Sequence, residues 1–153
     1  MKRKSWQVVL MAAALSLAPA GPVRAQADAG LTRMLVKSYD LLEAGNLAEA
    51  QKIFEQVLKQ DPGNPLALNN KAAVMVYEKK FDKADTYLND ALGKAKGYMV
   101  QVNRVCSVGN ICLAFKPVAS GTGNQDLEPL IKMNIEMVKG YMTAGPVPGK
   151  GLR

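Results

Sequence analysis

The chain of 153 residues contains no histidine. Histidine is the usual general base near neutral pH and the commonest zinc ligand, so its absence counts against most hydrolases and metalloenzymes. The sequence also lacks a glycine-rich phosphate loop and any metal-ligand spacing, and its serines have no histidine to activate them. We therefore expect a protein that is not an enzyme, with no catalytic residues, no bound metal and no cofactor.

Long hydrophobic runs are also scarce, and the longest lies near the N-terminus. Residues 8–18 form an apolar run of about 11 residues, which is too short for a bilayer core that needs ~20. Basic residues 2–4 precede it, a Pro/Gly break at 19–22 follows it, and small residues then offer a cleavage site near Ala27. This pattern predicts a signal peptide at residues 1–27, with an uncleaved anchor as the alternative. No cysteine stands just after the run to accept a lipid, so we expect an exported protein, periplasmic or secreted, without stable membrane insertion.

An excess of one charge sign is largely confined to that segment. The net charge of the whole chain is +7, from 20 basic and 13 acidic residues. Removing Lys2, Arg3, Lys4 and Arg24 leaves 16 basic residues against 13 acidic ones, a net charge of +3. A balance this small, with mixed signs along the chain, gives no stripe for phosphates and argues against nucleic acid as a partner.

What the sequence does contain is an internal repeat of 34 residues, a period that indicates a repeat architecture. When the chain is aligned on itself at this offset, small residues meet small ones and large residues meet large ones. The pairs are Ser38 with Ala72, Leu41 with Met75, Ala50 with Ala84 and Phe54 with Leu88. The apolar residues recur three and four positions apart, which predicts amphipathic helices. We place these helices at about 31–44, 47–60, 65–79 and 81–95.

Turn residues separate the predicted helices. Gly45 and Asn46 stand between the first and second, and Pro62 and Pro65 stand between the second and third. Proline cannot continue a helix and biases the residue before it away from helical geometry. The sequence therefore predicts two helix-turn-helix units in succession.

The stretch "YDLLEAGNLAEAQKIFEQVLKQDPGN" resembles the tetratricopeptide repeat, a 34-residue helix-turn-helix unit. Small residues stand where its two helices touch, large residues stand opposite, and Pro62 stands near the end. The second unit is weaker, with Lys96 at the terminal proline position. The resemblance implies an all-α fold, an α-solenoid of antiparallel helix-turn-helix repeats at 31–64 and 65–98 within residues 28–96. The packing residues it implies are Ser38, Leu41, Ala50, Phe54, Ala72, Ala84 and Leu88.

The remainder of the chain allows two interpretations. One is a divergent third helical pair at 97–143, with helices at about 98–114 and 126–143, a long loop at 116–125, and Asp126 as the cap of the second helix. A flexible tail at 144–153 would follow. The other interpretation takes the valine-rich stretch after residue 99 as a β-hairpin with its turn at 108–110.

The two cysteines bear on that choice. Cys106 and Cys112 both follow the predicted signal peptide, and in an oxidising compartment an even number of cysteines suggests a disulfide. On a continuous helix, residues six apart point about 120° away from each other, so a bond between them requires the helix to be broken. Five residues separate them, unlike a Cys-x-x-Cys motif, so we expect a structural disulfide or two buried thiols and not redox chemistry.

The resemblance also implies a concave groove lined by the first helix of each unit. The positions not used in packing, and so predicted to face a peptide, are Leu35, Tyr39, Leu42, Asn69, Asn70, Ala73, Tyr77 and Arg104. The tyrosines have an alternative role as fillers of the core between repeats. Some family members grip a terminal carboxylate with five residues, and only Asn70 and Arg104 match that set here. We therefore expect an extended or helical peptide and not a captured carboxylate.

The functional hypothesis is an exported adaptor that binds a protein or peptide partner in this groove during assembly of an envelope complex. Self-association is possible for such a module. The alternative is a structural subunit of a pilus, a secretion apparatus or an outer-membrane machine, which docks through its whole surface.

Overall fold

The computed structural model describes residues 29–104, 112–118 and 124–144. These residues form five helices, α1 (Ala29–Glu43), α2 (Leu47–Gln60), α3 (Pro65–Tyr77), α4 (Phe81–Ala95) and α5 (Glu128–Ala144). They also form four short strands, β1 (Met99–Val100), β2 (Val102–Arg104), β3 (Phe115–Pro117) and β4 (Gln125–Asp126). The predicted signal peptide, Cys106, the turn at 108–110 and residues 145–153 lie outside the described ranges.

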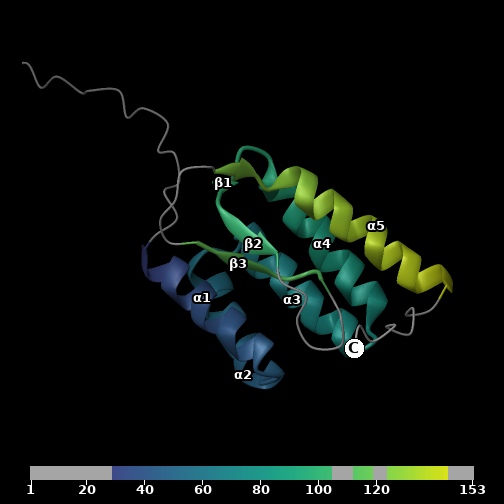
Figure 1. Cartoon of the computed structure of the whole chain (residues 1–153), viewed down its shortest axis with the longest axis horizontal. Coiled ribbons are helices and arrows are strands. Elements are labelled where there is room, and N and C mark those ends of the chain that lie inside the picture. Colours follow the sequence, from purple (N-terminus) through teal and green to yellow (C-terminus); the bar gives the residue numbers. More distant parts are fainter. Residues whose placement is uncertain (1–28, 105–111, 119–123, 145–153) are drawn as a thin grey trace, which may run out of the picture.

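The first four helices form two antiparallel hairpins packed side by side, α1 with α2 and α3 with α4 (Figure 1). The predicted all-α class and the helix-turn-helix packing are confirmed. Within the described ranges, no helix combines the length and the apolar character that a membrane span requires.

Both hairpins turn through the same backbone geometry, at positions 34 residues apart. Gly45 has φ +80°, and Lys79 in the second hairpin has φ +59°. The next amide closes each turn: Asn46 N donates to Leu41 O (2.8 Å) and Lys80 N to Met75 O (2.8 Å). A left-handed residue that ends a helix in this way is usually glycine, because a Cβ strains the conformation. The second hairpin therefore carries a strained lysine where the first has glycine.

The joint between the hairpins is built from the Asp-Pro-Gly-Asn-Pro stretch. Asn64 caps α3, since its Oδ1 accepts a hydrogen bond from Ala67 N (3.0 Å), while its Nδ2 donates to Asp61 Oδ2 (3.0 Å). Pro65 is the first residue of α3, a position where the missing N–H costs nothing. The chain therefore leaves α2 and starts α3 within five residues.

The core lies around α3, whose side chains from Pro65 to Val76 are buried except for Lys71. Most of the repeat-packing positions are fully buried: Ser38, Ala50, Phe54, Ala72, Ala84 and Leu88 have an exposed fraction of 0%. Leu41 is partly buried against the same core. Alanine at the helix crossings lets the backbones approach closely, and the larger residues fill the space beside them.

The helix predicted at 98–114 is wrong, because the described part of this stretch is extended. β2 pairs with β3 in an antiparallel ladder, Val102 opposite Pro117 and Arg104 opposite Phe115, and β1 pairs with β4. Gly97 ends the helical stretch with φ +74°. The valine-rich sequence that follows favours a pleated surface over a helix. The hairpin alternative agrees with the β2–β3 pairing, and the predicted loop at 116–125 begins inside β3 and ends inside β4.

A single helix therefore stands where a third helical pair was predicted. α5 covers most of the predicted 126–143 helix and packs against α4. Asp126 fixes its start: the carboxylate accepts Glu128 N (2.9 Å) and Gly97 N (3.0 Å). These hydrogen bonds, that of Glu128 first, hold the pKa of the Asp126 carboxyl below its ordinary value. The two amides also tie the end of the α4 segment to the beginning of α5.

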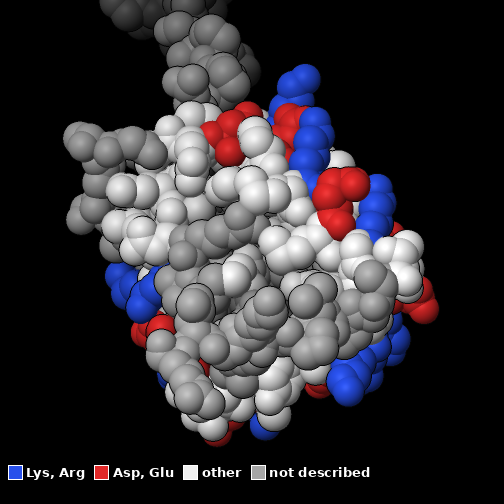
Figure 2. All heavy atoms as spheres, turned by 45° about the vertical axis from the view of Figure 1, so that its right-hand side comes forward, with Lys and Arg blue, Asp and Glu red and all other residues white. Residues whose placement is uncertain are grey.

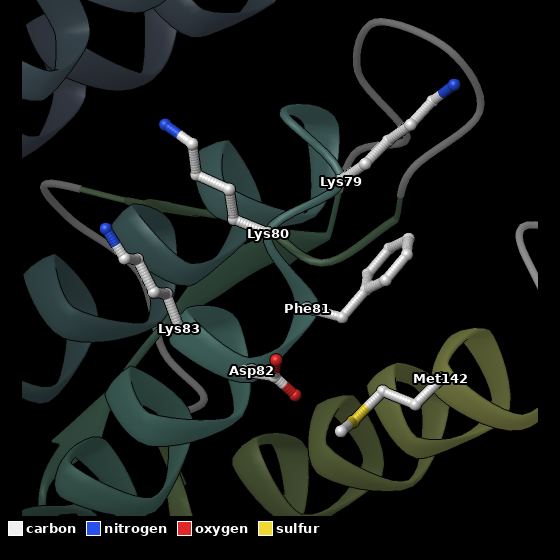
Figure 3. Close-up of a pocket in the computed structure, with 6 residues that line it drawn as sticks. All are labelled: Lys79, Lys80, Phe81, Asp82, Lys83 and Met142. Atoms are coloured by element: carbon white, nitrogen blue, oxygen red, sulfur yellow. The ribbon is translucent and has the colours of Figure 1, made fainter.

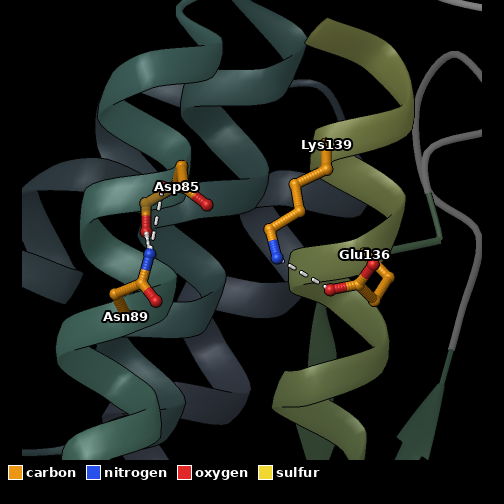
Figure 4. A network of polar contacts seen from close by, with 4 residues as sticks. All are labelled: Asp85, Asn89, Glu136 and Lys139. Carbon is orange, nitrogen blue, oxygen red and sulfur yellow. Dashed lines mark hydrogen bonds and ion pairs between the residues drawn. The ribbon is translucent and has the colours of Figure 1, made fainter. Parts of the chain in front are cut away.

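Polar pairs cover the outer surfaces of α4 and α5 (Figure 4). Asn89 Nδ2 donates to Asp85 O (2.8 Å) on α4, and Lys139 pairs with Glu136 (2.8 Å) on α5. The hydrogen bond to Glu136 raises the pKa of Lys139 above its ordinary value. On the face shown in Figure 2, described basic and acidic side chains lie close together with uncharged ones between them. Neither sign forms a continuous field there.

Candidate functional site

The face lined by α1 and α3, called the repeat groove below, is filled by the protein's own chain. Residues 113–117, called the groove segment, include β3, which contacts both α1 and α3 (Figure 1). Leu113, Ala114 and Phe115 each have an exposed fraction of 0%. The groove thus holds an extended peptide that belongs to the same molecule.

Asn70 of α3 holds the backbone of that segment at Phe115. Its Nδ2 donates to Phe115 O (2.8 Å), and its Oδ1 accepts from Phe115 N (2.9 Å). An extended residue presents its N–H and C=O toward the same side, so one primary amide can satisfy both. The Asn70 side chain is fully buried, where hydrogen bonds are not weakened by water and unpaired groups would be costly.

Two further asparagines complete this contact at Leu113. Asn69 Nδ2 and Asn134 Nδ2 each donate to Leu113 O (2.8 Å). Asn134 also donates to Asn69 Oδ1 (2.7 Å), and Asn69 donates to Asn70 Oδ1 (3.1 Å). The three amides form one buried network that joins α3, α5 and the groove segment.

Sequence reasoning missed Asn134. The signal lies in the apolar face of α5, where Ile131, Ile135 and Val138 are buried at helical spacing and Asn134 occupies the remaining position. A polar residue inside an apolar stripe must find a buried partner. The pattern identifies such a residue as one that binds a distant part of the chain, although it does not say which part.

A charged contact holds the next residue of the groove segment. Lys116 Nζ forms an ion pair with Asp40 of α1 and lies 5.6 Å from the centroid of the Tyr39 ring. An ammonium group near an aromatic face gains electrostatic attraction. Burial, followed by the charges of Glu43 and Asp40, raises the pKa of Tyr39 to about 12. Its hydroxyl has no hydrogen-bond partner among the described residues.

Comparison with known families accounts for this architecture. Residues 41–102, from within α1 to β2, match the model of the tetratricopeptide repeat family. The chain carries tetratricopeptide repeats. Repeats of this family generally bind protein partners, and α1–α2 and α3–α4 are the two predicted units.

A curated relative points the same way. The "Protein STIP1 homolog" of Dictyostelium discoideum is 37% identical over 90 residues, which is 52% of this chain. The chain spans only 16% of that relative's length. No solved structure matches the chain significantly.

Most of the predicted groove residues of these repeats are buried, so the expectation of an open groove is wrong. The buried ones are Leu35, Tyr39, Leu42, Asn69, Asn70 and Ala73, whereas the side chain of Tyr77 is 43% exposed. Arg104 lies in β2, and nothing is described of its side chain. The repeat pattern shows which positions the helical pairs leave free. It does not show that a later segment covers them.

A second hollow, of about 450 Å³, lies between the turn of the second repeat and the end of α5 (Figure 3). Phe81, whose ring centroid is 6.1 Å from that of Tyr141, lines it together with Met142. Lys80 and Lys83 point to one side and Lys79 to the other in Figure 3, so the ammonium groups do not converge on one anion. Among the described residues, no cluster of three potential metal ligands occurs.

Proposed function

We propose that this protein is an exported adaptor that binds an extended segment of a partner protein in its repeat groove. The observation that carries the proposal is the double hydrogen bond between the Asn70 side chain and the backbone of Phe115. A groove that holds one extended segment through backbone groups offers the same contacts to another, because every non-proline residue has these groups.

The proposal of export rests on residues 1–27 and on the cysteines. Cys112 is disulfide-bonded, and disulfides persist in oxidising compartments such as the bacterial periplasm. The pairing of Cys112 with Cys106, which lies outside the described residues, stays a prediction. The adaptor would act in assembly of an envelope complex, with a second copy of itself as one possible partner. The intact mass of the exported form should correspond to a chain that begins near Asp28, and retention of residues 1–25 in a membrane fraction would contradict export.

The chemistry of the chain supports binding and not catalysis. The sequence contains no histidine, and the polar groups gathered in the groove are amides that hold a backbone. Amides can neither take nor supply a proton readily near neutral pH. The proposal therefore assigns no catalytic residue, no cofactor and no nucleic acid partner.

One observation favours the alternative, a structural subunit of a pilus, secretion or outer-membrane machine. The groove is already filled, whereas Met99, Met133 and Met142 are about half exposed on the surface, at 53%, 47% and 46%. A subunit that docks through its outer surface would use such residues and leave the groove segment in place.

Site-specific photo-crosslinking separates these two functions. Tyr77 follows Asn70 by seven residues, nearly two helical turns, and so lies on the groove face of α3. Met133 on α5 is similarly exposed, 47% against 43%, and serves as the matched control. A crosslinking amino acid at position 77, but not at position 133, should capture one discrete partner from envelope extract. Capture at position 133 alone would favour the machine subunit and reject the adaptor.

A further inference from the structure

The contacts of the groove segment divide into two kinds. The three asparagines read backbone groups at Leu113 and Phe115, and any extended sequence supplies these. Two side chains add specificity: the Phe115 ring is fully buried, and Lys116 reaches Asp40. The groove therefore recognises an apolar residue followed by a cation.

We propose that residues 113–117 are an internal ligand, and that the partner displaces them with an extended segment of the same chemistry. That segment carries a large apolar residue at the position of Phe115, followed by lysine or arginine. The inference rests on the proposed function, because it names the partner for the same groove.

Exchange is balanced because the incoming segment can remake each contact that the groove segment gives up. It can also pair with β2, which otherwise pairs with β3 through only three residues, Val102 to Arg104. A strand so short loses few ladder hydrogen bonds when it leaves. Addition of a strand to an exposed sheet edge is a common way to bind peptides.

The internal ligand has the advantage of being tethered. A segment joined by a short linker has an effective concentration of order millimolar at its own site. The apparent affinity for a partner is reduced in proportion to the fraction of open grooves. Any change that weakens the groove segment without altering the groove should therefore strengthen partner binding.

The cation preference has a local electrostatic cause. Asp40 pairs with Lys116, and Glu43 lies close enough to influence Tyr39 as well. Both carboxylates come from α1, and the Tyr39 ring adds attraction for an ammonium group. An acidic residue in the same place would face two negative charges.

A labelled peptide tests the exchange. The probe is acetylated, amidated Leu-Ala-Phe-Lys-Pro-Val, the sequence of residues 113–118, and its binding to the mature chain is followed by fluorescence anisotropy. Lys116→Glu weakens the internal ligand at an exposed contact, and Phe115→Ala vacates the apolar site. Both variants should bind the probe at least about tenfold more tightly than wild type. Lys139→Glu, which breaks an exposed ion pair on α5, is the matched control and should bind like wild type.

Charge reversal tests the specificity. A probe with glutamate in place of lysine should bind Lys116→Glu at least about tenfold more weakly, and Asp40→Lys in the same background should reverse this preference. The proposal is overturned if wild type and both groove-segment variants, folded by circular dichroism, bind the probe equally or not at all. It is also overturned if the Asp40 reversal leaves the preference unchanged.

The outcomes separate this inference from the proposed function. If the probe behaves as expected but crosslinking at position 77 finds no partner, the exchange stands and the adaptor function fails. If a partner crosslinks at position 77 equally in wild type and in Lys116→Glu, the adaptor stands and the exchange is overturned.

Discussion

The side chain of Asn70 hydrogen-bonds to both backbone groups of Phe115, a residue 45 positions further along the chain, at 2.8 and 2.9 Å. Both residues are fully buried. The pair joins the second repeat to the segment that fills the repeat groove. A polar residue that resembles a ligand-binding group from the sequence is therefore also part of the core, and its removal has consequences for folding.

Asn70→Ala should destabilise the protein, contrary to what an exposed groove residue would do. The change leaves the N–H and C=O of Phe115 buried without their partner, and each such group costs ~1–3 kcal/mol. Denaturant unfolding measures the effect. Asn89→Ala, at an exposed position on α4, is the control and should change stability by less than about 0.5 kcal/mol. Equal unfolding midpoints for the two variants would mean that the groove segment does not depend on Asn70.

Ala50→Leu and Ala84→Leu should each cost ~1–3 kcal/mol, because a larger side chain at a helix crossing overpacks the core. Both alanines have an exposed fraction of 0%. Thermal unfolding checks the prediction, with Ala48→Leu on the exposed face of α2 as the control. A melting temperature unchanged by both core substitutions would contradict the repeat packing.

Lys79→Gly should stabilise the protein. Lys79 has φ +59° and occupies the position equivalent to Gly45 of the first repeat. Relief of the left-handed strain, ~1–2 kcal/mol for a residue with a Cβ, exceeds the entropy cost of glycine, ~0.5–1 kcal/mol. The control is Lys80→Gly, where φ is −94° and glycine can only add entropy to the unfolded chain. A loss of stability in both variants, measured by urea unfolding, would show that the turn is not strained.

Tyr39 should make the fold sensitive to alkali. Its pKa is raised from 10.0 to about 12, so ionisation favours the unfolded chain once the pH exceeds 10. The stability that this residue contributes is complete below pH 10 and is lost as the pH rises through 12, by at most about 2–3 kcal/mol.

Tyr39→Phe should reduce this loss while leaving neutral stability nearly unchanged, because the hydroxyl has no partner among the described residues. Unfolding curves between pH 9 and 12 provide the test. Tyr77→Phe, at an exposed phenol, is the matched control. The same alkaline loss in wild type and in Tyr39→Phe would exclude Tyr39 as its source.

Cys112 should be found bonded to Cys106. Trypsin cuts after Arg104 and Lys132 but does not cut the Lys116–Pro117 bond, so one peptide carries both cysteines. Without reduction this peptide should be lighter by two hydrogen atoms, and no free thiol should react. A disulfide that closes so short a loop contributes about 2 kcal/mol in the chain-entropy model, so reduction should lower the melting temperature. A disulfide-linked dimer on a non-reducing gel would instead assign the bond to two chains.

The sequence by itself determined the two helical repeats. The helices predicted at 47–60 and 81–95 are those observed, and the other two predicted helices of the repeats differ by about two residues at an end. Amphipathic spacing sets which face of each helix is buried. Gly45, Pro62 and Pro65 set where the chain must turn, and these are local effects that a single sequence displays.

Only the tertiary structure decided what the groove contains. The contacts of Asn70 with Phe115 and of Asn69 with Leu113 join residues 45 and 44 positions apart. No local periodicity records such a pairing, because an extended segment and a buried amide each satisfy many partners equally well. The stretch after residue 97 was open to a helix or a hairpin for the same reason. Its conformation is fixed by the buried amides and by α5, which meet it only when the chain is folded.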